Sequence, residues 1–321
     1  MLEKLINLFK KNHIKNMEEY IKLFKNREEL ESGIANLPKP SIATSKDTEK
    51  VVFKSLRTKS SGVYKTSTTT EGESVLVKNI TTEPEARIIA TATNGNVVLK
   101  NVVVNGAYTK AKGNTAISVN ASDDVAINGV DMTNASLSWN AIEVGLNSTP
   151  SNVDIENVTL KSTKNNGILI FKTKDNAVIN IKNVDFGEQV SNAIRISNYS
   201  NAKNVTINIE DCKVGRWDDG KEGAPSYPSA LYAGFFIFED YCPDHNTVEK
   251  AKEANLFGPD KIKIHIKNLT VGGKPYKPED VTELLGTGDI GGDRFGFISY
   301  DSANYAQPEY DENLFPEITF K

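Results

Sequence analysis

The fold is decided by the stretch Val153-Asp154-Ile155-Glu156-Asn157-Val158-Thr159-Leu160, which returns 26 residues later as Ile179-Asn180-Ile181-Lys182-Asn183-Val184-Asp185-Phe186. Up to the asparagine, apolar and polar residues alternate, as they do in a β-strand with one buried face. The alternation then slips by one residue, so that Glu156 and Asn157 both face outward. Because asparagine adopts left-handed backbone more readily than most residues, the slip predicts a corner of the chain at Asn157.

The same step recurs along the chain at a nearly constant interval. It falls at Asn79-Ile80, Asn101-Val102, Gly129-Val130, Asn157-Val158, Asn183-Val184, Asp211-Cys212 and Asn268-Leu269. The four intervals from Asn101 to Asp211 are 28, 28, 26 and 28 residues. Two apolar columns keep a fixed offset from the step, namely Val125, Val153, Ile179 and Ile207, and Ile127, Ile155, Ile181 and Ile209. Each column is predicted to stack into one buried row.

A second repeat is interleaved with the first. It reads Thr115–Val119, Asn140–Val144, Asn166–Ile170 and Asn192–Ile196, and its isoleucines are spaced by 25, 26 and 26 residues. One unit of this length cannot bury its own apolar face, whereas stacked units share a core. The pattern predicts an all-β fold, a right-handed parallel β-helix with three short strands in each rung of about 26–28 residues. A β-sandwich with evenly spaced strands is the alternative, but it does not require matching columns.

The repeat divides the chain into four predicted regions. They are an N-terminal helix (1–31), a linker or extended docking arm (32–70), the β-helix (71–275) and a C-terminal cap (276–321). Two insertions, near 215–230 and 241–260, enlarge one rung. The second insertion contains a stretch typical of a short helix, Asn246–Phe257.

Composition excludes several classes of partner. The net charge is −4, and no basic stripe with interleaved aromatic residues occurs, so nucleic acid is not an expected partner. No apolar run approaches the ~20 residues of a membrane span, so a membrane is not expected either. The N-terminus does not read as a signal peptide, and Cys212 and Cys242 are expected to stay reduced. These features indicate a protein made in a reducing cytoplasm.

Catalytic groups on a β-helix would have to come from its outward columns. Glycoside hydrolysis requires two carboxylates within reach of one bond. The outward column of the second strand is predicted to contain one acid and one base, through Ser118, Glu143, Leu169, Arg195 and Phe236. The column before the corner alternates in charge, which predicts a structural role for Lys100, Asn128, Glu156, Lys182, Glu210 and Lys267. We therefore expect no catalytic residue, no metal site and no cofactor, and a protein that is not an enzyme.

Aromatic residues gather in the enlarged rung. The predicted binding residues are Trp217, Tyr227, Tyr232, Phe236, Phe238 and Tyr241. Aromatic side chains offer a large contact area at low entropic cost, which suits both sugars and protein partners. The alternative is that Phe235 and Ile237 face the core while the inserted loops cover the remaining rings as a lid.

One segment carries a family resemblance. In Asn26–Ala43 a predicted helix ends at Pro38-Lys39-Pro40, and Asp47–Phe53 continues as an extended strand. This segment resembles a short N-terminal module of virion proteins in crAss-like and related phages of Bacteroidota. The β-helix body resembles phage fibre, spike and decoration proteins. The resemblance implies a structural virion component, namely a head fibre, capsid decoration or tail-associated spike protein, that is assembled in the bacterial host cytoplasm.

The resemblance also implies partners. Other virion proteins would be bound through the N-terminal region. The resemblance leaves open whether the chain forms a homotrimer and whether it binds a glycan or another host-surface ligand. Bacterial adhesins and polysaccharide lyases share the architecture, so a β-helix polysaccharide lyase or hydrolase and a host-glycan-binding adhesin are the alternative functions. The chain departs from the tailspike enzymes because its sequence shows no acid cluster.

Overall fold

The structure is a computed structural model. It describes residues 50–52, 63–82, 84, 86–108, 115–137, 139–163, 165–189, 192–217, 234–240, 245, 248–277, 296–299 and 313–321. All of these residues belong to one compact unit, residues 46–321. The helix predicted at 1–31 lies outside the described residues.

The described strands form two sheets, a larger one of 15 strands and a smaller one of 8. In order, the main path of the larger sheet is β1 (Lys50–Val52), β3 (Glu73–Thr81), β5 (Val97–Val103), β8 (Asp124–Leu137), β10 (Asn152–Thr163), β12 (Val178–Asp185), β15 (Val205–Glu210), β19 (Ile262–Lys267) and β23 (Glu317–Phe320). The smaller sheet is β2 (Val63–Thr68), β4 (Arg87–Ala92), β7 (Thr115–Ala121), β9 (Asn140–Val144), β11 (Asn166–Ile170), β14 (Asn192–Ile196), β18 (Gly234–Asp240) and β22 (Gly296–Ser299).

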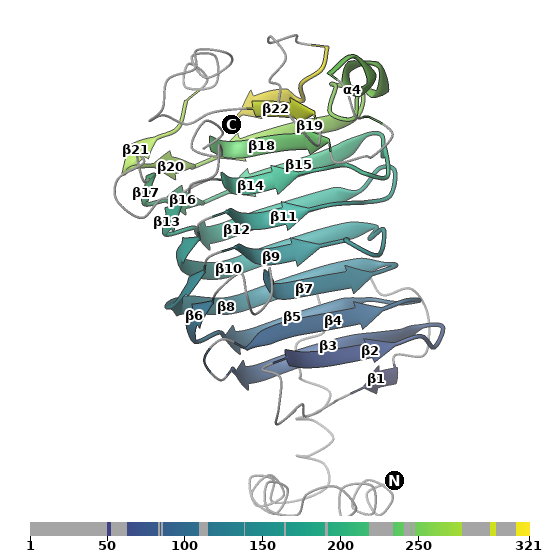
Figure 1. Ribbon diagram of the computed structural model, residues 1–321, viewed down its shortest axis with the longest axis vertical. Coiled ribbons are helices and arrows are strands. Elements are labelled where there is room, and N and C mark those ends of the chain that lie inside the picture. The colour runs from purple at the N-terminus through teal and green to yellow at the C-terminus, as the bar shows by residue number, and fades with distance from the viewer. Residues whose placement is uncertain are drawn as a thin grey trace, which may run out of the picture. The chain divides into compact units, whose positions relative to one another are not determined.

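Successive rungs pair in parallel. In β10 and β12, for example, Val153 lies beside Ile179 and Ile155 beside Ile181. The chain visits the larger sheet and the smaller sheet in turn, so each rung adds one strand to the smaller sheet and one to the main path of the larger sheet (Figure 1). The prediction of a parallel β-helix is confirmed at the level of a parallel-stranded solenoid.

The predicted corners have left-handed backbone. The φ angles of the corner residues are 54° at Asn79, 54° at Asn101, 73° at Gly129, 55° at Asn157, 50° at Asn183, 54° at Asp211 and 53° at Asn268. After the corner, short strands continue the rung, namely β6 (Gly106–Tyr108), β13 (Glu188–Gln189), β16 (Lys213–Val214), β17 (Arg216–Trp217) and β20 (Thr270–Val271). In β8 and β10 the strand runs through the corner without a break. The antiparallel partner of β20 is β21 (Lys274–Pro275).

The predicted columns form the core. Val125, Val153, Ile179 and Ile207 are in register on successive rungs, as are Ile127, Ile155, Ile181 and Ile209. All eight side chains are at most 1% exposed. The isoleucines and valines of the smaller sheet, such as Ile142 and Ile168, belong to the same core. The core therefore lies between the two sheets.

The solenoid extends beyond its predicted boundaries at both ends. β1 and β2 fall within the predicted arm at 32–70, yet they pair in parallel with β3 and β4. β22 and β23 fall within the predicted cap at 276–321, yet they extend both sheets. The helix predicted within Asn246–Phe257 is present as α4 (Val248–Ala254), inside the second insertion.

Candidate functional site

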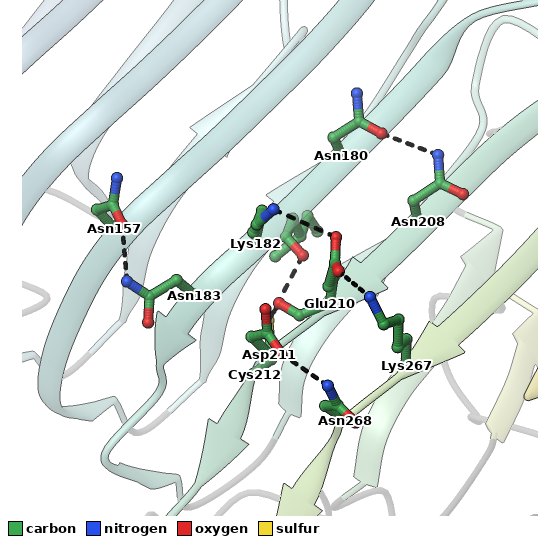
Figure 2. Close-up of polar contacts among 11 residues, drawn as sticks. Asn157, Asn180, Lys182, Asn183, Asn208, Glu210, Asp211, Cys212, Lys267 and Asn268 are labelled. Carbon is green, nitrogen blue, oxygen red and sulfur yellow. Dashed lines mark hydrogen bonds and ion pairs between the residues drawn. The ribbon is translucent and has the colours of Figure 1, made fainter. Parts of the chain in front are cut away.

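A column of charged side chains runs along the outer face of the larger sheet. On three successive rungs, Lys182, Glu210 and Lys267 are in register (Figure 2). Glu210 accepts a hydrogen bond from Lys267, and its other carboxylate oxygen lies 3.4 Å from Lys182 Nζ. Towards the N-terminal end of the same column, Asn128 Nδ2 donates to Glu156 Oε2 on the next rung at 3.2 Å. Five members of the column, all except Lys100, thus contact another member on a neighbouring rung, in line with the structural role that the sequence predicted.

Amide side chains form parallel rows beside the charged column. At the corner, Asn183 Nδ2 donates to Asn157 Oδ1 at 2.7 Å, and Asn268 Nδ2 donates to Asp211 Oδ1 at 2.9 Å (Figure 2). Between 2.7 and 2.9 Å, the same type of bond joins Asn152 to Asp124, Asn180 to Asp154 and Asn208 to Asn180. The corner asparagines thus have two roles. Their left-handed backbone forms the corner, and their side chains bond to the next rung.

Cys212 directly follows the corner residue Asp211 in the sequence. Its thiol is free and buried, with Sγ 3.3 Å from the carbonyl oxygen of Glu210 and 3.5 Å from that of Ile181. Burial raises the pKa of the Cys212 thiol to about 12. A thiol that stays protonated is a poor nucleophile and a poor metal ligand, so Cys212 is a packing residue. Cys242 lies outside the described residues.

The charged column makes a prediction for pH dependence. The hydrogen bond from Lys267 holds the pKa of the exposed Glu210 carboxyl below its usual 4.5, and Lys182 adds to this effect. A folded-state pKa below the unfolded one means that the stabilisation is complete above about pH 4.5 and is lost as the pH falls through the folded-state pKa. Carboxyl NMR titration should therefore give Glu210 a low midpoint, and Lys267→Ala should return it towards the usual value.

The control for this titration is Lys263→Ala. Lys263 lies on the same strand as Lys267 but pairs with Glu317, at 3.6 Å. This variant should leave the Glu210 midpoint unchanged. An equal shift in both variants would show that the general charge of the face, and not the Lys267 contact, sets the pKa of Glu210.

The outward column of the smaller sheet is buried. Ser118, Glu143, Leu169 and Arg195 are in register, as predicted, and are 2–8% exposed. Glu143 Oε1 accepts from Ser118 at 3.1 Å, and Glu143 Oε2 accepts from Thr115 at 2.8 Å. Both carboxylate oxygens are thus engaged by neighbouring hydroxyl groups.

The column differs from the prediction at its upper end. Ile237, and not Phe236, lies beside Arg195, while Phe236 lies beside Ile194. The prediction for Phe236 was wrong by one residue. The enlarged rung has no constant offset from the corner, so its register could not be read from the repeat.

The structure separates the predicted aromatic residues. Phe238 is fully buried and packs on Phe257, with ring centroids 5.6 Å apart, which removes it from the predicted binding surface. Phe235 is also buried, edge-on to Phe186, so the part of the alternative that places Phe235 in the core is confirmed. The part that places Ile237 there is wrong, because Ile237 is in register with Arg195 of the outward column. Trp217 lies in β17 beside Gln189. The residues Tyr227, Tyr232 and Tyr241 lie outside the described residues.

Further apolar residues, which sequence analysis missed, follow strands of the smaller sheet. Phe171 and Tyr199 follow β11 and β14 and pack on each other, with ring centroids 5.6 Å apart, and Leu146 follows β9. The side chain of Leu146 is 38% exposed. The three residues follow β9, β11 and β14 at different distances in the sequence, so no fixed period could have indicated them.

Within the ranges that the structure covers, no three His, Cys, Asp or Glu side chains are grouped as a metal site would require. In the same ranges, no helix has the length and apolar character needed to cross a lipid bilayer.

The rungs, corners and side-chain rows define a parallel β-solenoid. Comparisons with family models, with curated proteins and with solved structures found no match to this chain.

Proposed function

We propose that the chain is a structural component of a phage virion that acts by attachment and surface binding and not by catalysis. In this proposal the body is a right-handed parallel β-helix with three strands in each rung. It serves as a head fibre, a capsid decoration or a tail-associated spike. Residues before the solenoid attach it to other virion proteins, and its outer surface meets the host.

The observation that carries the proposal is the bonding of outward side chains to the next rung. Glu210 is held between Lys182 and Lys267, and Asn183 is bonded to Asn157. Such rows tie each rung to its neighbours on the outside, as the apolar columns do on the inside. A solenoid stabilised by both inner and outer side-chain rows is expected to be rigid. Rigidity is what a spacer needs to keep its shape outside a cell.

The state of the carboxylates supports the non-catalytic part of the proposal. A catalytic carboxylate needs an oxygen directed at the substrate. Both carboxylate oxygens of Glu143 accept hydrogen bonds from hydroxyl groups of the same sheet. The carboxylate of Glu210 forms ion pairs with two lysines. The carboxylates of these two acids therefore bond to residues of neighbouring rungs and stabilise the stack.

The test is a mass-spectrometric census of purified particles from a culture that carries the gene, with immunogold labelling against the solenoid. We expect the chain to copurify with the major capsid protein through density gradients, at a fixed copy ratio. A host cytoplasmic protein of similar size serves as the control for carry-over.

Two outcomes would contradict the proposal. The chain could be absent from particles while the purified protein degrades capsular or pectic polysaccharide, which would establish the lyase or hydrolase alternative. It could instead be found on bacterial cells and not on particles, which would establish the adhesin alternative.

A further inference from the structure

Asparagine followed by glycine is the pair of residues most prone to spontaneous loss of the asparagine amide. In this reaction the backbone nitrogen of the glycine attacks the side-chain carbonyl carbon of the asparagine. Glycine has no Cβ, so its nitrogen can approach that carbon with little steric hindrance. The chain contains four such pairs, namely Asn94-Gly95, Asn105-Gly106, Asn128-Gly129 and Asn166-Gly167. The fold decides which of these asparagines can reach the geometry of attack.

Two of the four asparagines lie in paired strands with both side-chain groups bonded. Asn166 is fully buried in β11, where its Nδ2 donates to Asn140 at 2.7 Å and its Oδ1 accepts from Asn192 at 3.0 Å. Asn128 lies in β8 and bonds to the next rung through Nδ2 and through Oδ1, at 3.2 Å in each case. Attack at either residue would require both bonds to break and the strand to leave its sheet.

Asn105 is anchored through its backbone and its side chain. Its backbone nitrogen donates to Thr82 Oγ1 at 3.1 Å, and its Nδ2 donates to Thr82 O at 3.1 Å. Its Oδ1 accepts from Asn134 Nδ2 at 3.5 Å. The side chain is half-buried between the two neighbouring rungs. These contacts hold the amide of Asn105 in place on both sides.

Asn94 differs from the other three because it lies in the turn between β4 and β5 and its side chain is exposed. Its Nδ2 donates to Thr69 O at 3.0 Å, but no described residue donates to its Oδ1. The attacking nitrogen is also available, since Gly95 N donates to no group of the described residues. Both partners of the reaction are therefore less constrained here than in the paired strands.

The turn itself is held by few bonds. The backbone oxygen of Asn94 accepts from Gly72 N at 2.9 Å, and that of Gly95 accepts from Asp123 N at 3.3 Å. Together with the side-chain bond to Thr69, these bonds have to open before the peptide group can rotate for attack. Opening a surface turn costs less free energy than removing a central strand from a sheet.

We propose that Asn94 is the site at which the folded chain deamidates, whereas the stack protects the other three asparagines. The nitrogen of Gly95 loses its proton and bonds to Asn94 Cγ. The bond from Cγ to the amide nitrogen breaks, and ammonia leaves with that proton. Water then opens the cyclic imide at one of its two carbonyl groups, which gives aspartate or isoaspartate without any change in oxidation state. The reaction needs only water, so it does not depend on a virion role.

The product changes the contact between neighbouring rungs. The Nδ2 donor of Asn94 is replaced by a carboxylate oxygen, which repels the carbonyl oxygen of Thr69. Isoaspartate also adds one carbon to the backbone path of the turn, whose carbonyl oxygen accepts from Gly72 N. Ageing of the chain therefore begins with a weaker contact between the turn after β4 and the turn beneath it.

The experiment incubates the full-length protein in mildly alkaline buffer and follows the four peptides by liquid chromatography and mass spectrometry. We expect the Asn94 peptide to lose its amide at least about tenfold faster than any of the other three, because the turn opens more readily than the strands. In urea, where the fold is lost, the four peptides should react at similar rates.

Asn94→Gln should abolish the fast reaction, because ring closure from the longer side chain is slow, and should leave the other three rates unchanged. The matched control is Asn134→Gln, the same change at another exposed asparagine, which should leave the rate at Asn94 unchanged. Circular dichroism should show that both variants are folded.

Three results would overturn the inference. One is an equal rate at all four asparagines of the folded protein, and another is a fastest reaction at Asn105, Asn128 or Asn166. The third is an equal advantage of Asn94 in urea, which would show that its sequence neighbours, and not the fold, set the rate. None of these results bears on the particle census.

Discussion

Replacing Ile181 with alanine is expected to lower the free energy of unfolding by about 2–5 kcal/mol, the range for large-to-small changes in a core. Ile181 is 0% exposed and lies in register between Ile155 and Ile209. Removal of its side chain leaves a cavity that in-register neighbours cannot fill without moving, because their backbones are fixed by parallel pairing. Urea denaturation followed by circular dichroism gives the measurement.

Val178→Ala is the matched control on the same strand. Val178 lies on the outer face of β12 and is only half-buried, so its truncation should cost much less than that of Ile181. Equal losses in the two variants would mean that the inward column does not carry more of the stability than the outer face. That result would contradict the assignment of the core.

Gly187→Ala is expected to be the most damaging single-methyl change. The backbone of Gly187 has φ 61°, and a Cβ would lie 2.3 Å from Lys161 O and 2.4 Å from Leu160 O. Left-handed backbone costs an alanine roughly 1–2 kcal/mol, and the clash with backbone atoms of the rung below adds to this cost. We expect a lower midpoint of thermal unfolding, or loss of soluble protein.

Gly272→Ala separates the two contributions. Gly272 has nearly the same φ, 57°, but no atom of the described residues lies within 4 Å of an added Cβ. It should therefore show only the conformational cost, and the difference between the variants measures the clash. Similar losses in both would show that the rungs separate easily at Gly187.

The corners were predictable because their chemistry is local. A phase slip in the apolar pattern and an asparagine at the slip are both visible in one rung, and Asn157 and Asn183 indeed have φ angles of 55° and 50°. The buried columns followed from the corners, since a fixed offset defines the register. The pairing of Ile155 with Ile181 therefore follows from the sequence alone.

The ends of the solenoid and the enlarged rung could not be predicted from the same signal. β1 and β22 lack the full repeat around the corner step, so nothing in their sequence marks them as rung strands. β18 follows an insertion of no fixed length, and its register with β14 was misjudged by one residue at Phe236. Sequence periodicity fixes register only where the period is kept.

The ring pair of Phe171 and Tyr199 was missed for a related reason. Phe171 lies one residue after β11, whereas Tyr199 lies three residues after β14. The two rings meet although their offsets from the strands differ, so no fixed period could have indicated the pair.

The parallel pairing of successive rungs also gives the solenoid a direction. In an antiparallel stack neighbouring strands reverse, whereas here β8, β10 and β12 all run the same way, and the two ends of the stack are unlike (Figure 1). Copies joined head to tail would contact each other through unlike surfaces and could add further copies without limit. Copies set side by side about one rotation axis would form a closed assembly in which every member points the same way.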